Sequence, residues 1–160
     1  MMADELASVR NLIERVRVAM VTTADPAGVL SCSPLQTLEL DADARLWLFV
    51  AASASSVEEL NRGYRRVCVT YSDPNKQDYA SFSGSGAIVH DHGKMRAHWN
   101  AWVGLWFPLG IEDSDVTLLC VTVDEARYWE APGSAYRQFH RQAGTPRNIP
   151  NAGEHAARSA

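Results

Sequence analysis

The sequence has no apolar run long enough to cross a membrane and no cluster of basic residues. Its longest nearly unbroken apolar stretch, residues 102–111, is shorter than the roughly 20 residues that a membrane-spanning helix needs. The formal net charge is −4, whereas binding to nucleic acid requires a basic face. The first residues are acidic, which is not typical of a secretory signal. We therefore expect a protein without a membrane or nucleic-acid partner.

Cysteine is scarce, and the three that occur, Cys32, Cys68 and Cys120, stand singly inside strand-like segments. No CxxC pair is present and the count is odd, so the spacing indicates no disulfide framework. We expect small, buried, apolar thiols in a reducing compartment. Without an export signal, this predicts a cytoplasmic protein.

Recognisable catalytic and metal-binding motifs are also missing. No GxSxG occurs and no cysteine has a histidine nearby in the sequence, so nucleophilic catalysis has no support. The glycines at 84 and 86 lie inside a strand pattern, which indicates a bulge or a close backbone approach rather than a dinucleotide loop. The histidines at 90, 92 and 98 lack ligand spacing and favour a solvated hairpin over a metal site. Any chemistry would therefore come from a bound cofactor.

What the sequence does contain is the alternation of a mainly β protein. At 160 residues and 46% hydrophobic content, it can form one domain with a sizeable core. Periodicity predicts helices over residues 4–15 and 53–60, and strands over 18–24, 29–40, 45–51, 66–72, 79–90, 117–123 and 127–130. The strand over 45–51 is apolar on both faces, so both faces must be covered. We predict a closed or half-closed β-barrel over residues 1–133 and a mobile C-terminal helix or tail over 134–160.

Three tryptophans, Trp99, Trp102 and Trp106, recur at helical spacing. This spacing predicts one helix over residues 93–107 with all three rings along a single face. The Pro-Leu-Gly sequence at 108–110 would end that helix. Such a stripe covers a barrel mouth, a second subunit or a planar cofactor, and packing in a core or a dimer is its more frequent role.

Eight segments in order resemble the flavin-binding split barrels related to pyridoxamine 5'-phosphate oxidase, in the bacterial general stress protein branch. They span roughly residues 6 to 133 and read AMVTT at 19–23 before a DPAG turn, PLQTL at 34–38, LWLF at 46–49, VEEL at 57–60, YSDP at 71–74, SG at 83–84, WFPLG at 106–110 and ARYWE at 126–130. The resemblance implies a six-stranded split barrel that forms a homodimer. It also implies two sites for FMN or FAD at the subunit interface.

The resemblance further implies which residues contact the flavin. They are Ser33, Pro34, Leu35, Gln36, Thr37, Phe49, Val50, Ala51, Ser55, Ser56, Tyr79 and Trp106. The isoalloxazine ring would stack against the segment from Pro34 to Thr37 and against the strand of Phe49. Gln36 or Thr37 would hydrogen-bond the ring edge, and aromatic groups of the partner chain would close the site.

The sequence departs from the family pattern where the flavin phosphate is held. Ser33 replaces an arginine, and Val50, Ala54 and Ser56 replace a threonine, a serine and a lysine. Serine hydroxyls near a helix N-terminus still donate neutral hydrogen bonds. Losing two charged contacts, at roughly 1.5–3 kcal/mol each, weakens binding by about two to four powers of ten. The phosphate clamp is therefore weakened.

Two functions remain open. In the first, the chain is a flavin-dependent oxidoreductase or flavin carrier. In the second, it is a non-catalytic split-barrel dimer that has lost strong flavin-phosphate binding or binds another small ligand. An arginine that reaches the clamp from elsewhere, such as Arg62, Arg65 or Arg66, would favour the first. No acid–base residue in the expected cleft identifies a substrate.

Overall fold

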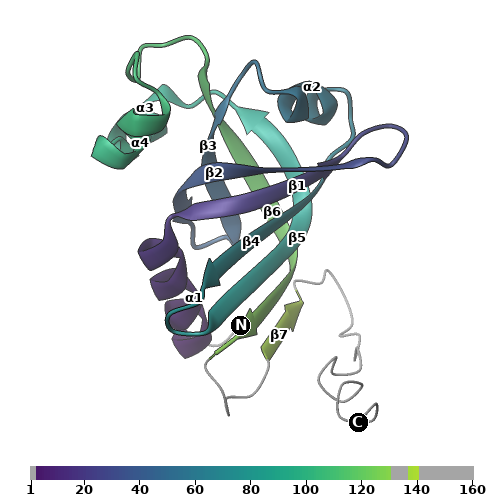
Figure 1. The fold of residues 1–160 in the computed structure, drawn as a ribbon, viewed down its shortest axis with the longest axis vertical. Coiled ribbons are helices and arrows are strands. Elements are labelled where there is room, and N and C mark those ends of the chain that lie inside the picture. The colour runs from purple at the N-terminus through teal and green to yellow at the C-terminus, as the bar shows by residue number, and fades with distance from the viewer. Residues whose placement is uncertain (1–2, 131–136, 141–160) are drawn as a thin grey trace.

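The computed structural model describes residues 3–130 and 137–140 of the chain. Its elements, in chain order, are α1 (Ala3–Val16), β1 (Val18–Ala24), β2 (Leu30–Leu40), β3 (Arg45–Ala51), α2 (Ser55–Asn61), β4 (Arg66–Asp73), β5 (Asp78–Val89), α3 (His92–His98), α4 (Ala101–Trp106), β6 (Val116–Trp129) and β7 (Arg137–His140) (Figure 1). The predicted mobile segment 134–160 lies outside the described residues, apart from the β7 backbone. Among the described helices, none has the length and apolar character needed to span a membrane.

The strands form a six-stranded antiparallel barrel, as predicted. Neighbouring strands follow the order β3-β2-β1-β4-β5-β6, and pairing of β3 with β6 closes the ring. β7 extends the sheet beyond β6, with Ala126 opposite Phe139. Every pairing is antiparallel, which lets short turns connect neighbouring strands. In the turn at 25–28, between β1 and β2, Gly28 has a φ of 82°.

Alternate residues of each strand fill the barrel interior. Leu48, Val69, Phe82 and Leu119 are each at most 1% exposed, and Tyr71 packs edge-on against Phe82. Apolar side chains of α1 and of α2 join the same core from two sides of the barrel (Figure 1). Burial of this apolar surface is the main force that holds the barrel together.

A second apolar layer covers the outer face of β3. Trp47 and Phe49 point out of the barrel but are only 7% and 1% exposed, because Met95 of α3 and Val103 of α4 pack against them. The prediction that both faces of this strand are covered is confirmed. The cover for Trp47 comes from the same chain, so this tryptophan does not require a second subunit to bury it.

The predicted single tryptophan helix is wrong, because the chain breaks it at Trp99 and Asn100. The Asn100 side chain caps α4 by accepting hydrogen bonds from the backbone N–H groups of Trp102 and Val103, at 2.9 and 3.2 Å. This cap requires an extended backbone at Asn100. As a result, Trp99 packs edge-on against Phe49, whereas Trp102 is 58% exposed.

The predicted interruption near residues 124–126 is also wrong, since β6 continues from Val116 to Trp129. A register shift between Ser83 and Gly84 leaves one extra residue, Asp124, on β6. At this bulge a Cβ on Gly84 would lie 2.0 Å from the Thr122 carbonyl oxygen. The glycine therefore marks a close backbone approach, as its position in a strand pattern predicted.

The cysteines differ in burial. Cys120 is 8% exposed and Cys68 is half-buried, but Cys32 is exposed. The prediction of a buried thiol is therefore wrong for Cys32. This residue lies on the first half of β2, whose residues from Leu30 to Pro34 are exposed because no other described element packs over them.

Candidate functional site

The barrel opens along one half of β2. β2 pairs with β1 from Leu30 to Gln36, but its register with β3 begins only at Thr37, opposite Leu48. β3 instead continues to Ala51 along β6, where Ala51 lies opposite Val116. The first half of β2 and the last residues of β3 therefore flank the split in the barrel.

Seven of the predicted contact residues gather at this split. Ser33, Pro34 and Leu35 lie on the open half of β2, Val50 and Ala51 end β3, and Ser55 and Ser56 begin α2 four residues later. Leu35 and Ala54 pack against the core cluster that contains Val50. Ser33 and Ser55 are exposed and Ser56 is half-buried, so all three hydroxyls are near solvent.

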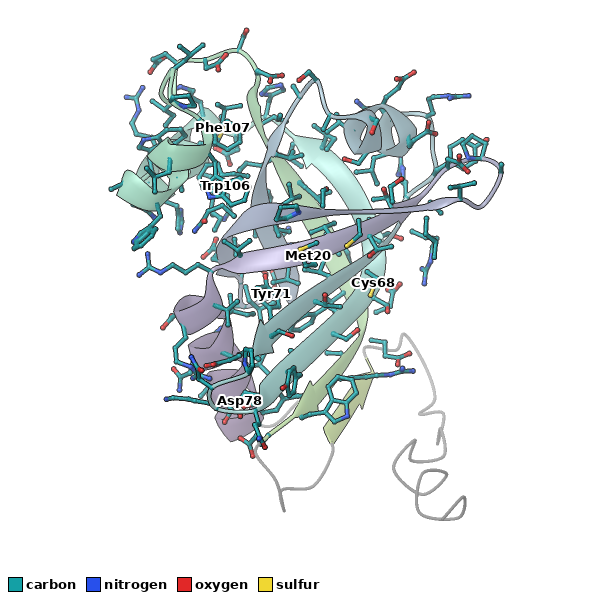
Figure 2. All side chains as sticks on the ribbon, in the orientation of Figure 1. Met20, Cys68, Tyr71, Asp78, Trp106 and Phe107 are labelled. Atoms are coloured by element: carbon teal, nitrogen blue, oxygen red, sulfur yellow. The ribbon has the colours of Figure 1, made fainter. Side chains whose placement is uncertain are left out.

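Three other predicted residues lie elsewhere in the single chain. Tyr79 pairs with Ser72 and Trp129, next to Asp78 at the lower end of the barrel in Figure 2. Trp106, 44% exposed, belongs to α4 at the opposite end of the view (Figure 2). Phe49 is buried against the α3–α4 layer. One chain therefore does not bring Tyr79 or Trp106 to the split.

The loop before α2 uses one of its serines for structure. The backbone N–H and the hydroxyl of Ser53 donate to the Asp115 carboxylate, at 2.7 and 2.9 Å. α2 begins at Ser55 and its N-cap is Ala54, which has no polar side chain to cap the helix. None of the nearby serines therefore caps this helix, and Ser53 is held by Asp115 instead.

Two of the three arginines that the sequence offers to the clamp form ion pairs with acidic residues. Arg62 pairs with Glu59 at 3.7 Å and Arg66 pairs with Asp124 at 3.2 Å. Arg65, the third candidate, is exposed. Ser33, Ser55 and Ser56 are the hydroxyl donors that flank the split. They form neutral hydrogen bonds, which are weaker than those of arginine or lysine to a phosphate.

Gln36 and Thr37 point in opposite directions from β2. The Thr37 hydroxyl and the Tyr71 hydroxyl lie 2.6 Å apart in the barrel interior, where burial raises the pKa of Tyr71 above its ordinary value. Gln36, only 4% exposed, instead lines a groove of about 560 Å³ between β2 and α1. Arg10 and Arg17 of this groove were not predicted, because the sequence carries no signal for how α1 docks on β2.

The fold and the open half of β2 can now be compared with known proteins. The family model described as pyridoxamine 5'-phosphate oxidase like matches residues 4–144. The chain belongs to this family. No curated protein gives a significant match to the sequence.

Solved structures of this family's fold superpose on most of the chain. A Clostridium acetobutylicum protein related to general stress protein 26 is 26% identical, with a TM-score of 0.72 over 88% of this chain and 96% of that chain. A general stress FMN/FAD-binding protein from Xanthomonas citri is 22% identical, with a TM-score of 0.68 over 92% and 99%. A pyridoxamine 5'-phosphate oxidase-related, FMN-binding protein from Nostoc punctiforme is 13% identical, with a TM-score of 0.67 over 89% and 94%.

Proposed function

We propose that this protein is a flavin-binding split-barrel protein of the general stress type, with FMN or FAD at the interface of a homodimer. One observation carries the proposal: the split gathers the β2, β3 and α2 segments where the family resemblance puts the flavin. Similar structures named as FMN or FMN/FAD binding support it. A bound flavin supplies hydride or single-electron transfer, which makes oxidoreductase chemistry the proposed activity.

The residues at the split fit a flavin unevenly. Pro34 and Leu35 offer apolar surface to a ring, and the β2 backbone beside them offers hydrogen bonds on its open edge. Ser33, Ser55 and Ser56 fit a phosphate only through neutral donors. The hydroxyl of the nearby Ser53 is held by Asp115. We therefore expect the ring to contribute more of the binding free energy than the phosphate does.

In this proposal the partner chain of the homodimer covers the flavin site. α4 and the turn after it expose Trp102, Leu105, Trp106 and Leu109, which are 44–79% exposed. A contiguous apolar surface of this kind marks an interaction site on a soluble protein. A two-fold dimer would bury it and bring a second chain to each split.

The test is a titration of FMN and riboflavin against the wild-type protein and the double variant Ser33→Arg with Ser56→Lys. We expect FMN to bind about thirtyfold more tightly to the variant, a gain of about 2 kcal/mol that shrinks as salt rises. Riboflavin lacks the phosphate, so its affinity should not change.

The matched control is Ser72→Arg with Asn75→Lys, which adds the same charges at exposed positions in and after β4. It should leave both affinities unchanged. Equal gains for riboflavin would show that the clamp variant acts on the ring pocket, and no gain for FMN would contradict the assignment of the phosphate site.

The serine-only clamp favours a second candidate, a non-catalytic split-barrel dimer. Arg62 and Arg66 form ion pairs with acids of their own surroundings rather than with the clamp. Under this function the wild-type protein binds neither FMN nor riboflavin. The same titration therefore decides between the two candidates.

A further inference from the structure

The groove between α1 and β2 has the size of a small-molecule site. Its volume of about 560 Å³ falls within the roughly 300–1,000 Å³ of such sites. Ile13 of α1 and Leu38 and Leu40 of β2 contribute apolar surface to it, and Asn100, the N-cap of α4, lies at its edge. Figure 1 shows α1 and α4 on either side of the point where β1 begins. The groove is thus a built concavity between three elements.

The Gln36 side chain lines this groove without a hydrogen bond to a described residue. Gln36 is 4% exposed, and its side chain has no hydrogen bond to any residue that the structure describes. A glutamine amide donates two hydrogen bonds and accepts two. Among the described residues only Glu59 Oε2 is a fully buried side-chain polar atom without a partner, so the Gln36 amide atoms still reach solvent in the groove. The Gln36 amide is therefore free to hydrogen-bond a molecule that enters the groove.

Two guanidinium groups flank the groove without a carboxylate partner among the described residues. Arg10 donates from Nη2 to the Asp41 carbonyl oxygen at 3.2 Å. The Arg17 guanidinium lies over the Trp102 ring, 5.8 Å from its centroid. Arginine binds carboxylates through two parallel hydrogen bonds, so both groups are suited to a ligand anion.

The backbone of Arg17 is fixed where α1 ends. Its φ of 63° lies in the left-handed region, where glycine usually ends a helix. Its N–H donates to the Ile13 carbonyl oxygen at 2.8 Å and its carbonyl accepts from the Thr37 N–H at 2.7 Å, so α1 and β2 hold it in place. This backbone therefore fixes the base of the Arg17 side chain beside the groove.

The acids of the groove are mostly neutralised. Glu39 forms an ion pair with Lys94, and Asp41 forms one with Arg45 at 2.8 Å. Glu14 is exposed and forms no ion pair with a described residue. Two unpaired guanidinium groups and one unpaired carboxylate leave the groove with a net positive charge.

We propose that this groove binds a small organic carboxylate with an apolar body. Arg17 and Arg10 hold the carboxylate, Gln36 donates to one of its oxygens, and the apolar body lies against Leu38 and Leu40. If the protein binds a flavin as proposed above, this carboxylate is the class of substrate that would react with it. Only this assignment as a substrate rests on the proposed function.

The binding step is tested with benzoate and its neutral isostere benzamide, titrated by calorimetry into the full-length protein without added flavin. We expect benzoate to bind at one site per chain and benzamide to bind at least about tenfold more weakly, because it lacks the charge-assisted contact. Absence of benzoate binding, or equal affinities for the two probes, overturns the proposal.

Variants locate the site. Arg17→Gln should weaken benzoate about tenfold and leave benzamide unchanged, since only the charged pair is lost. Gln36→Glu keeps the shape of the side chain but opposes an anion, so it should abolish benzoate binding and spare benzamide. The control Arg96→Gln removes an exposed arginine of α3 and should change neither affinity. A loss with Arg96→Gln as large as that with Arg17→Gln overturns the proposal.

The same proteins are titrated with FMN. Benzoate binding that persists in a protein without FMN affinity leaves the groove assignment intact and contradicts only the proposed function. FMN binding without benzoate binding contradicts the groove assignment and leaves the proposed function intact.

Discussion

The Asp41 carboxylate organises the turn between β2 and β3. Oδ1 accepts from the backbone N–H groups of Asp43 and Arg45, at 2.9 and 3.0 Å. Oδ2 accepts from Arg45 Nε at 2.8 Å and from the Trp47 indole N–H at 2.9 Å. Burial alone would raise the pKa of Asp41, but the hydrogen bonds from Trp47 and Arg45 hold this pKa below its ordinary value.

Asp41→Asn tests how much this carboxylate stabilises the barrel. Asparagine keeps one oxygen for the two backbone donors but turns an NH₂ group toward Arg45 Nε and the Trp47 indole. Trp47 is 7% exposed, so its N–H then lacks an acceptor and is shielded from water. An unpaired buried donor costs roughly 1–3 kcal/mol, and with the lost charge-assisted bond to Arg45 we expect a total of about 2–4 kcal/mol.

The effect should depend on pH in one direction. The pKa of Asp41 is lowered in the folded state, so its contribution is fully present above the unfolded pKa of about 4. It is lost as the pH falls through the folded pKa. The difference between wild type and Asp41→Asn is therefore largest at neutral pH and narrows under acid conditions.

Urea unfolding, followed by tryptophan fluorescence at neutral and acid pH, measures both quantities. The control is Asp124→Asn, whose ion pair with Arg66 joins side chains that are 52% and 73% exposed. It should change the free energy of unfolding by no more than about 1 kcal/mol. A loss below about 1 kcal/mol for Asp41→Asn at neutral pH, or a difference that does not narrow in acid, would refute the reasoning.

Two further predictions concern the thiols and the assembly. In the native protein Cys120 should react with a thiol reagent more slowly than Cys32. Cys120 is buried and burial raises the pKa of its thiol, whereas Cys32 is exposed. Site-resolved mass spectrometry measures the two rates, and equal rates would contradict the assigned strand faces. Light scattering at micromolar concentration should return twice the chain mass of 17.6 kDa, and Leu105→Ser with Trp106→Ser should shift it toward the monomer, because these side chains form the exposed apolar surface of α4. A monomer mass for the wild type would contradict the dimer.

Local sequence patterns were enough to predict most strands and the first helix. The strand over residues 45–51 has the same bounds in the structure, because a short run that is apolar on both faces and bounded by turn residues is typical of a buried strand. The α1 pattern was equally clear, since its apolar residues follow one helix face. The family resemblance then joined these elements into a six-stranded barrel, which the structure confirms.

Local patterns failed where a side chain competed with regular structure. Apolar spacing ran through Trp99 and Trp102 without a break, but the capping bonds of Asn100 start a new helix there. The polar residues near 124 resembled a strand end, yet a bulge opposite Gly84 accommodates the extra residue and β6 continues. Both outcomes depend on contacts that no periodicity encodes.

The candidate sites divide in the same way. The family resemblance proposes which residues stand in the clamp, and the sequence alone shows that Ser33 and Ser56 carry no charge. Only the tertiary structure decided that Asp115 engages Ser53, that the split separates β2 from the end of β3, and that Arg17 and Gln36 face one groove. These contacts join segments that are far apart in the chain, and they arise from the docking of α1 and from the closure of the barrel by β6.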